Sequence, residues 1–152
     1  MLVRKFGQVR RFYRRAAAPG GGAQQWVRGC ALALAIVPGV VSAEQVPSGQ
    51  PVELYEVLID RVGNEDWLRF RFLAPEIARA LGRYSFADVA PDMTVLCDEI
   101  AVPYMADQGL SADKVAIGLS DREVPFGVPD PEATQFIELY HVEGDRCIWE
   151  AF

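Results

Sequence analysis

The sequence predicts an α+β fold, with an antiparallel sheet of about five strands and one main helix, at about residues 91–107, packed on one face. Three observations support this prediction. Residues 67–73 alternate between apolar and polar side chains, which is the period of a strand. Residues 92–107 place apolar side chains at helical spacing instead. Turn-forming residues divide the remaining apolar runs into short segments.

The first 43 residues form a segment of their own. They contain no Asp or Glu, seven basic residues and an apolar run of 12 residues that ends before Ser42 and Ala43. A basic region, a short apolar core and small residues are typical of a secretory signal. We therefore expect a signal peptide over residues 1–43 that is cleaved between Ala43 and Glu44. The alternative is a retained membrane anchor, but a span needs about 20 apolar residues.

The expected product is a single small acidic α+β domain over residues 44–152, in the periplasm. Two export routes, the general secretory and the twin-arginine route, stay open because Arg10-Arg11 and Arg14-Arg15 are paired. The product has eight basic and 21 acidic residues, a formal charge of −13 against −6 for the whole chain. This charge argues against nucleic acid as a partner, since phosphate binding needs a basic surface. We expect no stable membrane span after cleavage.

A hairpin begins the domain. An apolar-rich run ends near Val62, and Gly63-Asn64-Glu65-Asp66 has strong turn chemistry. The alternation that follows places Leu68, Phe70 and Phe72 on one face, and Trp67, Arg69 and Arg71 on the other.

Helical signals come next. Residues 75–81 predict a short helix, and Ser85 with Asp88 resembles a capping box, after which Pro91 is expected to begin the main helix. The apolar stripe of this helix includes Cys97, which places that side chain inside the fold. Pro103 predicts a kink or a separate last turn, because it lacks a backbone donor.

The rest of the chain predicts strands at residues 115–119, 136–142 and 147–152. Between the first two, residues 120–131 are rich in proline and glycine, which argues against regular structure. Stiff loops often carry recognition residues. We therefore treat this segment as a possible binding loop, whose candidate residues are Arg122, Glu123, Phe126 and Asp130.

Two cysteines remain after cleavage, Cys97 and Cys147. In an oxidising compartment such a pair favours a disulfide, and closing a loop of about 50 residues is worth about 4 kcal/mol. The alternative is two separate buried thiols.

No catalytic set stands out. His141 is the single histidine, which with the cysteines leaves no zinc constellation. Carboxylates gather around the main helix at Asp88, Asp92, Asp98 and Glu99, where capping and a solvated helix face explain them. No phosphate-binding, dinucleotide-binding or EF-hand motif appears, so we expect no cofactor and no metal.

Several short stretches look familiar, among them residues 47–52, 68–75, 119–122 and 147–150. Together they resemble a domain-of-unknown-function family of small exported alphaproteobacterial proteins. The resemblance implies export and a paired role for the two cysteines, but it brings no activity. Members are sometimes labelled acetolactate synthase. This chain is far too short for that enzyme and lacks its Gly-Asp-Gly thiamine diphosphate motif.

The sequence favours a non-catalytic periplasmic binding or accessory module of the cell envelope. Such a module would engage an envelope protein or a small ligand through the loop at residues 120–131. Two alternatives stay open. One is a small periplasmic hydrolase that uses carboxylates near Asp88–Glu99, and the other is a structural envelope component.

Overall fold

The computed structural model describes residues 2–4 and 45–151. The expected cleavage site between Ala43 and Glu44 lies outside the described residues, as does most of the expected signal peptide. No helix in the described part of the chain is long and apolar enough to cross a membrane.

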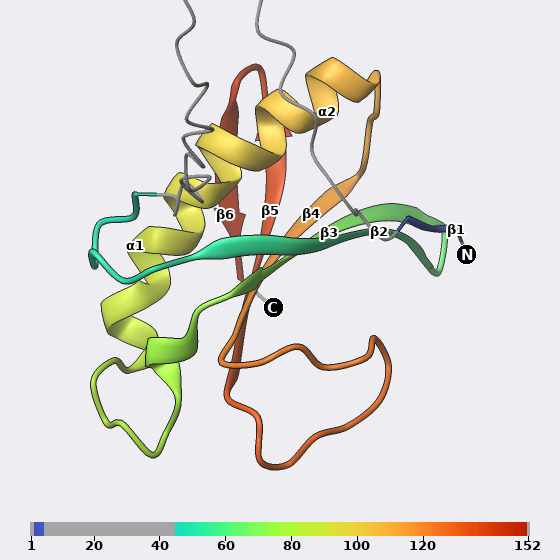
Figure 1. Cartoon of the computed structure of the whole chain (residues 1–152). Coiled ribbons are helices and arrows are strands. Elements are labelled where there is room, and N and C mark those ends of the chain that lie inside the picture. Colours follow the sequence, from blue (N-terminus) through green and yellow to red (C-terminus); the bar gives the residue numbers. More distant parts are fainter. Residues whose placement is uncertain (1, 5–44, 152) are drawn as a thin grey trace, which may run out of the picture. The chain divides into compact units, whose positions relative to one another are not determined.

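The described strands form one sheet whose spatial order follows the sequence (Figure 1). Strand β1 is a three-residue strand within the expected leader. The five strands of the acidic domain agree with the predicted number. The bounds are β1 Leu2–Arg4, β2 Glu53–Val62, β3 Glu65–Leu73, β4 Lys114–Ser120, β5 Gln135–Glu143 and β6 Arg146–Glu150.

The sheet is mostly antiparallel, and the pairing of β3 with β4 is the exception. These two strands run parallel, with Phe70 opposite Ile117. The prediction of an antiparallel sheet was therefore wrong at this pair. The reason is the helical connection between the two strands. It returns the chain to the end of the sheet where β3 begins, so that β4 starts beside the start of β3.

Two tight hairpins join neighbouring antiparallel strands. The pairs that close them are Val62 with Glu65 and Glu143 with Arg146. In each turn the first residue is a glycine with positive φ, +63° at Gly63 and +64° at Gly144. Two-residue turns that match the twist of a hairpin need this backbone conformation, which glycine adopts without steric cost.

The main helix is longer than predicted and has three parts. They are α1 (Phe86–Leu96), a π-helical turn (Cys97–Ala101) and α2 (Val102–Gln108). The start predicted at Pro91 was wrong, because the contact of Ser85 with Asp88 already caps the helix before Phe86. Near Pro103 the hydrogen-bonding pattern changes from π-helical to α-helical between Ala101 and Val102, while the backbone of both residues stays helical. The short helix predicted at residues 75–81 is a single 3₁₀ turn, Pro75–Ile77.

One hydrophobic core joins the helical segment to the sheet. Phe70 and Tyr104 make an edge-to-face ring contact with centroids 5.4 Å apart, and the Thr94 and Tyr140 hydroxyl groups lie 3.2 Å apart. The members of this core that come from α1 and from three adjacent strands are Val89, Met93, Leu96, Leu68, Phe70, Phe72, Val115, Ile117, Leu119 and Tyr140. The alternation predicted for β3 is confirmed, since Leu68, Phe70 and Phe72 all enter this core.

A disulfide fastens the helical segment to the last strand. Cys97 and Cys147 are bonded, with Cα atoms 6.0 Å apart and both side chains buried. Beside the bond, the backbone N–H of Cys147 donates to Asp98 Oδ1 at 2.7 Å. The paired interpretation of the cysteines therefore holds in this structure.

Candidate functional site

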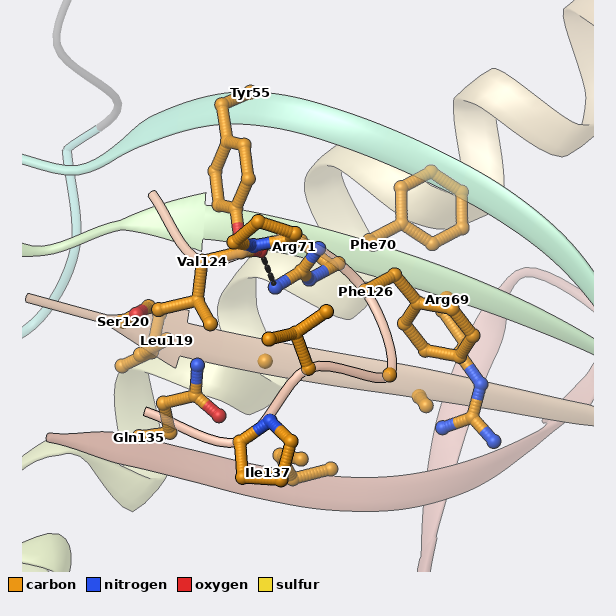
Figure 2. A pocket seen from close by; sticks show the side chains of 16 residues that line it. Tyr55, Arg69, Phe70, Arg71, Leu119, Ser120, Val124, Phe126, Gln135 and Ile137 are labelled. Carbon is orange, nitrogen blue, oxygen red and sulfur yellow. Dashed lines mark hydrogen bonds between the residues drawn. The ribbon is translucent and has the colours of Figure 1, made fainter. Parts of the chain in front are cut away.

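A pocket lies between the sheet and the loop that joins β4 to β5, residues 121–134 (Figure 2). We call the sheet surface beneath it the outer face. It is formed by the residues that alternate with the core residues of the strands: Arg69 and Arg71 of β3, Ala116 and Gly118 of β4, and Ile137 of β5. The pocket volume is about 300 Å³. This value is at the lower end of the range for small-molecule sites.

Arg71 connects the loop to the sheet. Its side chain is only 14% exposed, and its Nη1 donates to Glu56 Oε2 at 2.5 Å. Its Nη2 donates to the backbone carbonyl of Val124 at 2.7 Å, the bond drawn dashed in Figure 2. Charge-assisted hydrogen bonds of this kind are among the stronger ones in proteins. Arg71 therefore fixes the loop at Val124, close to the start of the loop, relative to the outer face of the sheet.

A β-bulge supplies two of the groups around Arg71. The pairing of β2 with β3 shifts between Leu54 and Glu56, which leaves Tyr55 as the extra residue. Successive strand residues normally point to opposite faces, but a bulge redirects them. Here Glu56 pairs with Arg71, and the Tyr55 ring lies 5.0 Å from the Arg71 guanidinium carbon. Neighbouring residues thus contact the same guanidinium.

Arg69 and Phe126 form the second wall. The Arg69 Nε donates to Asp60 Oδ2 at 3.0 Å, and its guanidinium carbon is 4.9 Å from the Trp67 ring. The Phe126 ring of the loop lies 5.5 Å from the Arg69 guanidinium and 5.9 Å from that of Arg71. Phe126 is therefore placed against the sheet by two cation–π contacts.

Tyr55 brings a polar group with unused hydrogen-bonding capacity. Its hydroxyl is buried and makes no well-formed hydrogen bond to another described residue, although the backbone N–H of Val124 lies near enough to lower its pKa. Burial raises the pKa of this hydroxyl, and the positive charge of Arg71 opposes the rise. A buried polar atom without a partner is uncommon and often marks a site that a ligand or water completes.

Gly118 lines the pocket floor and, because it has no side chain, leaves space above the strand. A β-carbon built there would meet Ile137 Cγ1 and the Phe70 carbonyl at 3.8 Å each, which is ordinary van der Waals contact. The backbone at this position therefore does not require glycine. A glycine inside a strand often marks a place where another group approaches the backbone closely.

Separate hydrogen bonds hold the end of the loop that leads into β5. The backbone N–H of Arg79 donates to Thr134 Oγ1 at 3.1 Å, and Arg79 Nη2 donates to the Pro131 carbonyl at 2.6 Å. The backbone N–H of Thr134 also donates to Asp121 Oδ1 at 3.1 Å. The loop is thus fixed at both ends, which is the condition for a preorganised pocket.

The structure separates the four loop residues that the sequence singled out. Phe126 lines the pocket. Arg122 points elsewhere, pairing with Asp121 at 3.2 Å and donating to the Glu132 carbonyl. Asp130 accepts the Glu132 N–H within the loop, and Glu123 is exposed. The sequence interpretation missed Tyr55, Arg69, Arg71 and Gly118. The alternation of residues 67–73 did place both arginines on one face, which was the available signal.

The carboxylates of the main helix are not brought together in a pocket. Asp88 contacts Ser85, whose hydroxyl lowers the pKa of that carboxyl. Asp92 is fully buried and accepts hydrogen bonds from Ser48 and Gln50. Asp98 accepts from the backbone N–H of Cys147, and Glu99 is exposed.

His141 also lies outside the pocket. Its Nδ1 is 2.9 Å from Glu150 and its Nε2 is 3.0 Å from Glu143, in the hairpin of β5 and β6. In the described part of the chain, no group of three or more His, Cys, Asp or Glu residues could hold a metal ion.

The fold and the pocket define a small, disulfide-linked α+β protein with a cavity of ligand size. The chain belongs to a family of unknown function, DUF6497, whose sequence pattern matches residues 30–152. No curated protein and no solved structure matches the chain.

Proposed function

We propose that the protein is a non-catalytic binding or accessory module of the periplasm that holds a small ligand in the pocket beneath the 121–134 loop. The observation that supports this best is the pocket itself, with two largely buried arginines held in place on its walls. A loop fixed at both ends reduces the entropy lost on binding, so a small cavity can still bind usefully.

The proposal assigns different roles to the two faces of the sheet. It takes the helical segment to pack on the face opposite the pocket, which the shared core of α1, β3 and β4 supports. The outer face is then left for the loop and the ligand.

Two features support the proposed compartment. The first 43 residues have the composition of a secretory signal. The disulfide between Cys97 and Cys147 suits an oxidising environment such as the periplasm.

The absence of catalysis is part of the proposal. A hydrolase that uses the carboxylates near Asp88–Glu99 would need them in one concave site. Instead, Asp88 contacts the residue before α1, and Asp92 holds residues 48–50 against the helix. These structural contacts favour a binding role over a hydrolytic one.

The experiment is a screen of small amphipathic compounds by ¹H–¹⁵N NMR on the disulfide-bonded protein. We expect the amides of Gly118, Phe126 and Gln135, which line the pocket, to shift together. Gly118→Val adds methyl groups to the pocket floor and is expected to abolish these shifts. Ala106→Leu adds bulk at an exposed position of α2 and serves as the control.

The screen decides against the proposal if no compound shifts the pocket amides, or if Gly118→Val binds as well as the control. That result would favour the interpretation as a structural envelope component. A compound that binds only at other surfaces would have the same meaning.

A further inference from the structure

We propose that the pocket takes a small organic carboxylate with a compact apolar body, whose carboxylate binds the Nη groups of Arg69. This inference rests on the proposed function, because it names the class of ligand for the same pocket. Four features of the walls support it: the unused donors of Arg69, the occupied aromatic faces, the apolar rim and the volume.

Both Nη groups of Arg69 lack a hydrogen-bond partner among the described residues, whereas each Nη group of Arg71 already donates one hydrogen bond. Arg71 uses Nη1 for Glu56 and Nη2 for the Val124 carbonyl. Arg69 uses Nε for Asp60, and its Nη atoms make no hydrogen bond to any residue that the structure describes. The Arg69 side chain is 19% exposed, so these donors are only partly hydrated. A carboxylate is the planar acceptor that matches a guanidinium edge.

The same walls disfavour a cation. The Tyr55 and Phe126 rings, which could receive one, already face arginines at 5.0 Å and 5.5 Å. A cationic ligand would therefore meet two guanidinium groups instead of open ring faces. The chain as a whole is acidic, and Asp60 lies beside Arg69, so we expect an anion to bind weakly rather than tightly.

Apolar residues at the rim of the pocket are the reason why we expect the ligand to have an apolar body. Val128 and Ile137 both line the pocket and are 55% and 46% exposed, although large apolar side chains normally seek burial. Ala116 and Val124 add apolar surface beneath them. A ligand with a ring or a short branched chain would remove this surface from water, which is favourable by about 25 cal/mol per Å².

The volume limits the ligand. A cavity of about 300 Å³ lies at the lower end of the range for small-molecule sites, so it suits a compact ligand rather than an extended one. Benzoate is compact, and it combines a carboxylate with a flat apolar ring. Benzyl alcohol and benzylamine have the same shape without the negative charge, so they are the natural comparison.

The test is an NMR titration of the disulfide-bonded protein with benzoate, benzyl alcohol, benzylamine and acetate. We expect benzoate to shift the pocket amides of Arg69, Gly118 and Phe126, with benzyl alcohol binding at least tenfold more weakly and benzylamine not at all. Acetate, which lacks the apolar body, should also bind at least tenfold more weakly. Each tenfold step corresponds to about 1.4 kcal/mol.

Three variants separate the contributions. Arg69→Gln should weaken benzoate to the level of benzyl alcohol while leaving benzyl alcohol unchanged. Arg69→Lys keeps the charge without the planar fork and should give an intermediate affinity, which guards against misfolding of the glutamine variant. Arg83→Gln removes an exposed arginine that pairs with Glu76 away from the pocket, and should leave benzoate binding intact.

The outcomes distinguish this inference from the proposed function. If benzyl alcohol binds as tightly as benzoate in the pocket, and Arg69→Gln changes neither, the carboxylate assignment is wrong while the binding function stands. If benzoate shifts amides only around Arg79 and Arg122, the assignment is also wrong. If none of the four probes shifts a pocket amide, the inference fails, and the broader compound screen decides on the binding function.

Discussion

The two faces of strand β3 differ although they share one backbone. On one face Phe70 and Phe72 are fully buried in the core. On the other, Arg69 and Arg71 are also largely removed from water, but they are paired with Asp60 and Glu56. The first face gains free energy from burial alone, whereas the second must also overcome the desolvation of charged groups.

The charged face of β3 is not what stability alone would require. Replacing a buried ion pair by apolar residues of similar volume is often neutral or stabilising. A sheet that only needed to fold could therefore carry apolar residues beneath the loop. Under the proposed function the arginines serve binding, while the apolar face serves stability. The predictions below measure what the groups on each side of the sheet contribute to stability.

The largest effect is expected from the disulfide, which lies on the core side. The double variant Cys97→Ala/Cys147→Ala opens a loop of 50 residues and should lower the free energy of unfolding by about 4 kcal/mol. Urea unfolding followed by circular dichroism measures it. Adding a reductant to the wild type should give a similar loss and should not affect the variant. A loss below about 1 kcal/mol would show that the core holds the helix without the bond.

The next effect compares the same substitution on both faces. Ile117 is fully buried in the core, whereas Ile137 is 46% exposed at the pocket rim. Ile117→Ala should cost about 3 kcal/mol because it removes buried methyl groups and leaves a cavity. Ile137→Ala should cost less than ~1 kcal/mol, as surface changes usually do. The urea midpoints of the two variants measure the difference. Equal costs would remove the distinction between the faces.

A smaller effect concerns the ion pair beneath the loop. Arg71→Met alone leaves the Glu56 carboxylate, 12% exposed, without its partner and should cost about 2 kcal/mol. The double variant Glu56→Leu/Arg71→Met should return to within ~1 kcal/mol of the wild type. Unfolding of all four proteins of the cycle gives the coupling energy. A double variant worse than either single one would mean that the charged pair is itself needed for stability.

The core face could be predicted from the sequence, but much of the pocket could not. Alternation assigned the side chains of residues 67–72 to the two faces of the strand, because a strand has a period of two. The role of Tyr55 could not be predicted, because the bulge at this residue depends on how β2 pairs with β3 and no local sequence pattern indicates that pairing. The predicted helix start at Pro91 was wrong, because the capping contact of Ser85 with Asp88 starts the helix earlier than the usual place of proline in the first turn would indicate. The parallel pairing of β3 with β4 likewise depends on the path of the helical connection.

The smallest effect concerns an ion pair at the other end of the sheet, between Lys114 and Glu150. The hydrogen bond from Lys114 lowers the pKa of the Glu150 carboxyl in the folded protein. A lowered folded pKa means that its stabilising contribution is present above the ordinary value of about 4.3 and is lost as pH falls. The same hydrogen bond raises the pKa of the Lys114 amine, so that contribution is lost only at strongly alkaline pH.

Glu150→Gln should therefore flatten the fall of the urea midpoint between about pH 5 and pH 3, with little change in the shape of the curve at neutral pH. The control is Glu53→Gln, because Glu53 is exposed and makes no ion pair with another described residue. This variant should follow the wild-type pH curve. If Glu150→Gln follows it as well, the pair is fully screened by solvent, as many exposed ion pairs are. In that case the Lys114–Glu150 pair would differ from the pair of Arg71 with Glu56, whose energetic role beneath the loop the double variant measures.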